Sequence, residues 1–345
     1  MTVTATPSST ADSRAAVVSA RARGMCDPVL RASVDTLPDP LRRMAGYQFG
    51  WCDRAGAPTR TQSGKMMRPA LVFGTATACG GSAAAAVHAA AAMELMHNFS
   101  LLHDDVMDGD RARRGRATVW CVWGTANAIL LGDALQALAS RVLAAGRPAR
   151  RAGEAVGRLE AAVVEMCRGQ CEDCAFETRH RVGVQEYLRM AMGKTGALMG
   201  CACALGAQSA GADAATIAAM DEFGRQLGLA FQSADDVIGI WGDPQVTGKP
   251  AGNDLARRKR SLPVVAALQS PTAAASELAA LYRSETPMTP TDVARATALV
   301  EAAGGRERAE QYADDQVHAA IDALPDHTIA ADLRALAQAV AHRNR

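Results

Sequence analysis

The stretch AAAAMELMHNFSLLHDDVMD, residues 89–108, predicts a long apolar helix that ends in three carboxylates. It is followed by GDRARRGRAT, a composition typical of a loop. Asp104 and Asp108 are four residues apart, which places them on one face of the helix, and Asp105 lies beside them. Carboxylates this close repel one another unless a cation lies between them. The stretch therefore predicts a helical core element and a metal site at its carboxyl end.

A second acidic pair, Asp235 and Asp236, lies near the end of another apolar stretch, FGRQLGLAFQSADDVIGI (223–240). Two long helices with acidic ends are expected to form facing walls of one cavity. Carboxylate oxygens suit Mg²⁺, which keeps several waters and completes its shell with phosphate oxygens. For either cluster alone, a solvated acidic helix end explains the pattern equally well. Together, the two clusters predict a diphosphate bridged by magnesium.

Composition favours helices throughout the chain. Hydrophobic residues make up 49% of the sequence but aromatic residues only 4%, since alanine, the strongest helix former, fills much of the apolar share. We expect an all-α fold with a flexible Ser-, Thr-, Ala- and Pro-rich tail at 1–16, one domain over 17–345, and an irregular loop at 242–260. Helices are expected from residue 67 and over 126–145, 152–174, 184–205, 214–240, 262–281, 290–303, 306–324 and 329–342.

Charge and hydropathy exclude some function classes. The 37 Lys and Arg residues nearly balance the 36 Asp and Glu residues, so no global field would attract nucleic acid. We find no apolar run near the ~18 residues that span a bilayer, which predicts no stable membrane insertion. The nine cysteines form no framework typical of disulfides, so we expect a cytoplasmic protein.

Cations are distributed along the chain in short motifs. Each one alone is most simply a solvated surface charge, but a phosphate-rich ligand requires several of them together. The candidates are Lys65 and Arg68 in GKMMRP, Arg113 and Arg114 in RRG, Lys194 in GKT and Lys249 in TGKP.

These acidic and basic motifs occur in an order that resembles the trans-isoprenyl diphosphate synthase (polyprenyl synthetase) family, from about Gly64 to Pro263. The resemblance implies an isoprenoid synthase fold, an antiparallel helix bundle around a central cavity, and a homodimer. It implies a prenyl transferase that joins isopentenyl diphosphate to an allylic diphosphate. The allylic C–O bond ionises, the alkene attacks, and a proton is then lost, while an apolar interior excludes water.

The resemblance also implies roles for individual residues, with two or three Mg²⁺ ions as cofactors. The first acidic motif (Asp104, Asp105, Asp108) should hold two ions, and the second (Asp235, Asp236) a third. Isopentenyl diphosphate should meet Lys65, Arg68, His97 and Arg114, and the allylic diphosphate Arg113, Lys194 and Lys249. Thr195 and Gln232 match positions beside the forming carbocation, and Gln170 and Lys259 match further substrate-binding positions.

The sequence departs from the family pattern at Gly239, where a third carboxylate of the second motif is usual. Asp243, four residues later, is one candidate to replace it. The product length is expected to depend on Phe99 and Ser100, just before the first motif. A small Ser100 with a bulky Phe99 favours the C20 product geranylgeranyl diphosphate, with the C15 product next and longer chains possible. Two other functions stay open: a class I terpene cyclase on the same scaffold, and a non-catalytic partner subunit of a synthase.

Overall fold

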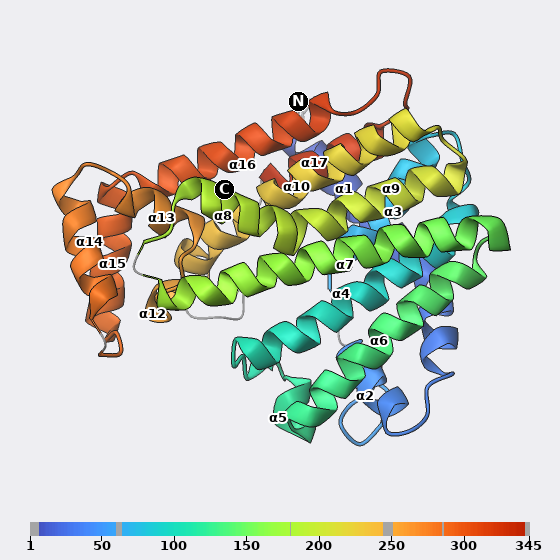
Figure 1. Ribbon diagram of the computed structural model, residues 1–345, viewed down its shortest axis with the longest axis horizontal. Helices are drawn as coiled ribbons and strands as arrows, with labels where there is room; N and C mark the ends of the chain where they lie inside the picture. The colour runs from blue at the N-terminus through green and yellow to red at the C-terminus, as the bar shows by residue number, and fades with distance from the viewer. Residues whose placement is uncertain (1–6, 60–63, 180, 244–250, 285, 342–345) are drawn as a thin grey trace, which may run out of the picture.

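A computed structural model describes residues 7–59, 64–179, 181–243, 251–284 and 286–341. Within these ranges the fold is a bundle of helices with one two-stranded hairpin, as the composition predicts. In Figure 1 the long helices α16, α10, α7 and α4 run in similar directions across the molecule, and α14 and α15 form a pair at one end. The all-α prediction is confirmed.

The helices fall into three groups along the chain. The first group is α1 (Pro7–Val34), α2 (Leu41–Gln48), α3 (Met67–Ala78), the 3₁₀ turn η1 (Ala83–Ala86), α4 (Val87–Met107), α5 (Val119–Trp123) and α6 (Thr125–Ala145). The second is α7 (Ala149–Thr178), α8 (Val184–Ala191), the π-helical turn η2 (Met192–Gly196), α9 (Ala197–Ala210) and α10 (Ala214–Trp241). The third is α12 (Asn253–Ala256), α13 (Leu262–Leu268), α14 (Ala273–Arg283), α15 (Pro290–Ala302), α16 (Gly305–Asp322) and α17 (Ala331–Ala341).

Small residues allow the central helices to pack closely. A Cβ atom at Gly169 of α7 would overlap the backbone nitrogen of Lys194 in η2, and one at Gly228 of α10 would overlap the backbone of Gly196. Only glycine fits at such backbone contacts. The helices α7, η2 and α10 are therefore held together backbone against backbone, next to the acidic end of the bundle.

The structure corrects several sequence predictions. Helix α1 begins at Pro7, a favourable first helical position, and Ala15 is buried, so the flexible tail predicted for 1–16 is wrong over 7–16. The predicted helix 262–281 is broken after Leu268, because Pro271 cannot continue it, and α14 restarts behind the cap of Thr272. The strands β1 (Ala112–Arg113) and β2 (Arg116–Ala117) form a short hairpin. The strands are too short to show the alternation of apolar and polar residues that predicts a strand.

One helix, α6, is long and apolar enough to cross a membrane by length and composition, contrary to our count of apolar runs. Leu131 and Leu135 on this helix are fully buried, and α6 packs along α4. Ile129 and Leu130, in contrast, are 40% and 58% exposed. One face of α6 therefore belongs to the core, whereas another apolar face of the same helix is uncovered.

Candidate active site

The two acidic motifs lie at the same end of the bundle, on α4 and α10, as predicted. The guanidinium of Arg68 on α3 lies within the fields of both Asp104 and Asp235. Burial lowers the pKa of Arg68, and the negative charges of Glu94, Asp104 and Asp235 act in the opposite direction. The two acidic helix ends thus approach a common buried cation.

Asp104 has the surroundings expected of a cation ligand. Burial raises the pKa of its carboxyl, the ammonium of Lys194 opposes this rise, and the charge of Asp108 adds to it. Within the described ranges, no three His, Cys, Asp or Glu side chains converge closely enough to hold a metal by themselves. These hard oxygen ligands fit Mg²⁺, provided that water and substrate oxygens complete the coordination shell.

Asp105 points to a different partner from its neighbours. Its side chain is 2% exposed, and its Oδ1 accepts a hydrogen bond of 2.7 Å from Nε of Arg113. Its Oδ2 is buried without a hydrogen-bond partner, and burial raises the pKa of this carboxyl to about 6. Arg113 is thereby held next to the first motif by a buried carboxylate.

Asp236 is the centre of a buried hydrogen-bond network. Its Oδ2 accepts from the hydroxyl of Tyr187 at 2.6 Å and from the backbone N–H of Leu262 at 2.7 Å. Its Oδ1 accepts from Nε2 of Gln232 at 3.0 Å, and the Oε1 of Gln232 accepts from the hydroxyl of Thr195 at 2.7 Å. Asp236 thus fixes the orientation of the amide predicted to stand beside the carbocation. Because neighbouring groups occupy both of its oxygens, the second motif directs only Asp235 outward.

The turn η2 positions Lys194 and Thr195. A π-helical turn adds a residue to the helical repeat, and such turns are frequent at functional sites. Nζ of Lys194 donates to Oδ2 of Asp173 at 2.5 Å, and the Lys194 side chain is only 16% exposed. Asp173 follows Gln170 on α7, and Oε1 of Gln170 is buried without a partner. On α7, Gly169 thus makes a close backbone contact. Asp173, further along the same helix, supplies a carboxylate that the sequence analysis did not identify.

Lys259 lies in a second group of carboxylates. Burial acts to lower the pKa of this lysine, but the charges of Asp173, Asp254, Asp236 and Asp108 outweigh it and raise the pKa above its usual range. Lys259 therefore stays protonated, between the first motif, the second motif and α7. Lys249, the remaining predicted cation, lies outside the described residues.

A separate cationic group lies at the start of α3. Arg68 and Arg114 both face Glu94 of α4, a side chain that is 2% exposed and whose pKa is raised by burial. Arg114 has a φ of 52°, and its guanidinium covers Gly64 so closely that a Cβ atom there would overlap it. His97 lies near Arg68 and Arg114. The structure thus brings together Arg68, His97 and Arg114, with Lys65 next to Gly64 in the chain.

Known proteins resemble most of this chain. A family model described as polyprenyl synthetase matches residues 50–300. The chain belongs to this family. A geranylgeranyl diphosphate synthase of Mycobacterium tuberculosis is 56% identical over 323 residues, which cover 94% of this chain and 92% of the relative. A (2E,6E)-farnesyl diphosphate synthase of Mycobacterium bovis is 42% identical over 330 residues, 93% of this chain and 91% of the relative.

Solved structures show the same family fold. A polyprenyl synthetase from Streptomyces coelicolor matches with a TM-score of 0.88 at 45% identity, covering 94% of this chain and 98% of that one. A geranylgeranyl pyrophosphate synthetase from Pyrococcus horikoshii matches with a TM-score of 0.80 at 31% identity, with the same coverage of both chains. Like the relatives named for this activity, the chain is an enzyme of the trans-prenyl diphosphate synthase class.

The carboxylate beside Gly239 is that of Asp254, and not that of Asp243, which the sequence suggested. A Cβ atom at Gly239 would overlap Oδ2 of Asp254, which lies on α12, fifteen residues later. The candidate Asp243, in contrast, is exposed beyond the end of α10. Asp254 therefore occupies the space beside the second motif that a side chain at position 239 would fill. Only the packing of α12 against α10 reveals this, since no spacing rule connects the two residues.

The pH dependence of stability offers a test of the His97 environment. Burial, and then the positive charges of Arg68 and Arg114, lower the pKa of His97 well below its usual value, so the folded protein holds this ring neutral. The unfolded chain protonates it below about pH 6.5, so the free energy of unfolding should fall as pH drops below 6.5, by up to about 1.4 kcal/mol per pH unit. Urea titrations of metal-free protein between pH 5 and 7.5 should show this slope reduced in His97→Gln. The exposed His318→Gln is the control, and equal slopes in all three proteins would contradict the assignment.

Proposed function

We propose that this enzyme condenses isopentenyl diphosphate with allylic diphosphates and that its main product is geranylgeranyl diphosphate, with farnesyl diphosphate next. The observation that carries this proposal is the presence of two separate cationic groups beside the facing acidic helices. Lys194 and Lys259 lie among the carboxylates, whereas Arg68 and Arg114, beside the neutral ring of His97, form a second group around Glu94. Two anionic substrates require two such groups, and the relative at 56% identity is named for the C20 product.

We assign the direct ligand role for two or three Mg²⁺ ions to Asp104, Asp108 and Asp235. Asp105 and Asp236 receive a positioning role instead, since Oδ1 of Asp105 accepts from Arg113 and both oxygens of Asp236 accept from the Tyr187–Gln232–Leu262 network. When bound, the magnesium ions would neutralise the negative charge of the leaving diphosphate. Glu94 and Asp173, both largely buried, hold the cations of the two groups in place.

The remaining chemistry follows from the side chains of η2 and α10. Lys194 and Lys259 offer fixed positive charge to the allylic diphosphate as its C–O bond breaks. The Thr195 hydroxyl and the Gln232 amide, joined at 2.7 Å, present weakly nucleophilic oxygens that stabilise a carbocation. We propose that the departing diphosphate accepts the proton lost after condensation. Buried apolar side chains of α4 and α10 exclude water from the cation.

A product assay tests this function directly. Purified protein with Mg²⁺, isopentenyl diphosphate and a C5, C10 or C15 allylic primer should yield longer prenyl diphosphates, identified by chromatography and mass analysis. Formation of a cyclic hydrocarbon from the allylic substrate alone would instead make the protein a terpene cyclase. Absence of turnover with every primer would favour a non-catalytic partner subunit.

Phe99 is proposed to limit the length of the product. It is 5% exposed on α4 and packs edge-on against His103, with ring centroids 4.9 Å apart. Phe99→Ala removes most of this side chain, so products longer by one or more C5 units should appear. Met93→Ala, fully buried on another face of α4, is the matched control and should leave the product unchanged. Unaltered chain length in Phe99→Ala would place the limit elsewhere.

We propose that the enzyme is a cytoplasmic homodimer. The exposed apolar face of α6, with Ile129 and Leu130, is of the kind that a second copy covers. All nine cysteines are free in the structure, which fits a reducing compartment. Sedimentation equilibrium of wild-type protein and of Leu130→Glu would test the dimer, because a charge at this position should dissociate it.

A further inference from the structure

Arg260 is a buried cation that the proposed reaction does not use. Its side chain lies over the ring of Tyr282, with Cζ 4.8 Å from the ring centroid, and the residue is 8% exposed. Nη2 donates to the carbonyl oxygen of Arg179 at 3.1 Å. Nε and Nη1, however, are buried without a hydrogen-bond partner. A buried guanidinium with two unsatisfied donors is unfavourable unless an anion completes its bonds.

This side chain lines a cavity of about 560 Å³ beside the end of α7, the end of α13 and α14. Arg181 and Arg283 also line the cavity, and both are exposed. Neither forms an ion pair with the residues that the structure describes, and the lining of the cavity includes no carboxylate. Three arginines therefore surround one hollow that contains no balancing negative charge.

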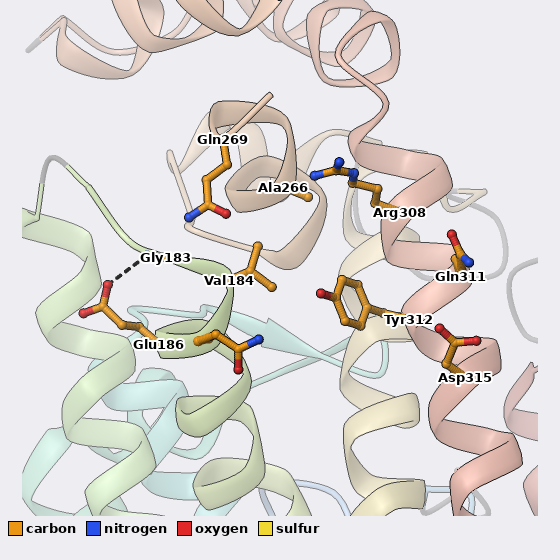
Figure 2. A pocket seen from close by; sticks show the side chains of 10 residues that line it. Gly183, Val184, Glu186, Ala266, Gln269, Arg308, Gln311, Tyr312 and Asp315 are labelled. Carbon is orange, nitrogen blue, oxygen red and sulfur yellow. Dashed lines mark hydrogen bonds between the residues drawn. The ribbon is translucent and has the colours of Figure 1, made fainter. Parts of the chain in front are cut away.

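The neighbouring pocket provides a contrast. Figure 2 shows this larger pocket of about 780 Å³ between α8, α13 and α16, and it shares Gly183 and Gln269 with the Arg260 cavity. Its one arginine, Arg308, faces a lining that also includes Glu186 and Asp315. The pocket of Figure 2 thus lacks the excess of positive charge that the Arg260 cavity has.

The cavity is distinct from the proposed active site, although the two are neighbours in sequence. Lys259 is directed toward Asp173 and Asp254, whereas the next side chain, Arg260, is directed toward Tyr282 and the end of α7. Consecutive residues of this extended segment thus face opposite sides. The backbone N–H of Leu262, two residues further on, is bonded to Asp236. The same short segment borders both sites.

We propose that the Arg260 cavity is a second anion site that binds a small phosphate-bearing molecule, either free phosphate or diphosphate or a phosphate monoester. The planar guanidinium fork matches two phosphate oxygens, and Arg181 and Arg283 supply further charge at the mouth. A volume of about 560 Å³ exceeds that of a bare phosphate and accommodates an ester of nucleotide size. The site does not depend on the proposed prenyl transfer.

Binding of defined probes to metal-free protein tests the site. The probes are inorganic phosphate, diphosphate and adenosine monophosphate, titrated by calorimetry into the full-length protein in chloride buffer with chelator. Arg260→Met keeps the apolar stem but removes the donors, and it should weaken at least one probe about tenfold or abolish one binding event. Arg308→Met, an equal loss of charge in the pocket of Figure 2, should bind as the wild type does. The probe whose affinity falls most in Arg260→Met identifies which kind of phosphate-bearing molecule the cavity binds.

Thermal unfolding provides a readout independent of any binding at the active site. In phosphate-free buffer Arg260→Met should unfold at a higher temperature than wild type, because it removes an uncompensated buried charge. The preferred probe should raise the unfolding temperature of wild type more than that of the variant. Equal probe affinity in wild type and Arg260→Met, or equal weakening in Arg308→Met, would overturn the proposal. If Arg260→Met fails to fold, the exposed pair Arg181→Met and Arg283→Met together should still weaken binding.

Discussion

Replacement of Asp104 by Asn should lower kcat by about 10²–10³-fold, the loss typical when one charged group that stabilises the transition state is removed. Asp104 lies near the end of α4 in the fields of Lys194 and Asp108, where we propose that it binds magnesium directly. An amide keeps the shape of the side chain but loses the charge that holds the metal. The binding of metal-bridged diphosphate should therefore fail without a change in fold.

The same substitution should make the metal-free protein more stable. Because burial raises the pKa of Asp104 in the folded state, the ionised carboxylate opposes folding above its ordinary pKa, and this contribution disappears in Asn. Thermal unfolding with chelator, and again with Mg²⁺ and diphosphate, measures both effects. Wild type should gain stability from the ligands and Asp104→Asn should not. Asp322→Asn, on an exposed side chain of α16, is the control, and a destabilised but active Asp104→Asn would refute the role.

Removal of the Asp254 carboxylate should reduce activity by about 10–100-fold, the usual effect of losing a group that supports metal ligands. Asp254 lies against Gly239 and in the field of Lys259, where we propose that it replaces the third acid of the second motif. Gly239→Asp alone should also be impaired, since its Cβ atom would overlap the Asp254 carboxylate. Restoring the common family residue is thus expected to harm this enzyme.

A double exchange distinguishes replacement from a mere packing defect. Gly239→Asp combined with Asp254→Gly moves the carboxylate from α12 to α10 and should recover activity relative to either single variant. Gly239→Ala combined with Asp254→Gly has the same backbone and no carboxylate, so it serves as the control. Initial rates and the Mg²⁺ concentration for half-maximal rate should be measured for all variants. Equal activity of the two double variants would show that the carboxylate has no role.

The sequence predicts this site better than its surroundings. Helical spacing predicts that Asp104 and Asp108 share one face, whereas Gln232 is predicted only by the resemblance to the family. The partners of Asp105 and Asp236 could not be predicted, since they depend on the hairpin after α4 and on the segment before α13.

Two further features required the path of the chain. Asp254 approaches Gly239 because α12 packs against α10, and no local pattern predicts this contact. The first helix was missed because its Ser, Thr and Pro residues are typical of tails, while its burial comes from contacts with α17 and α3. Intrinsic helix propensity is a weak predictor of an element that tertiary packing stabilises.

The backbone contacts among α7, η2 and α10 set the spacing of these elements independently of the length of the product. An evolving enzyme has to change these two properties separately. Where Gly169 meets the backbone of Lys194, the spacing of the ionising groups does not depend on the size of any core side chain. Phe99 lies on α4, outside this glycine-held frame. Substitutions at Phe99 would then change the proposed limit on product length without changing the spacing of α7, η2 and α10. A lineage of such enzymes could diversify its products through a few neutral steps.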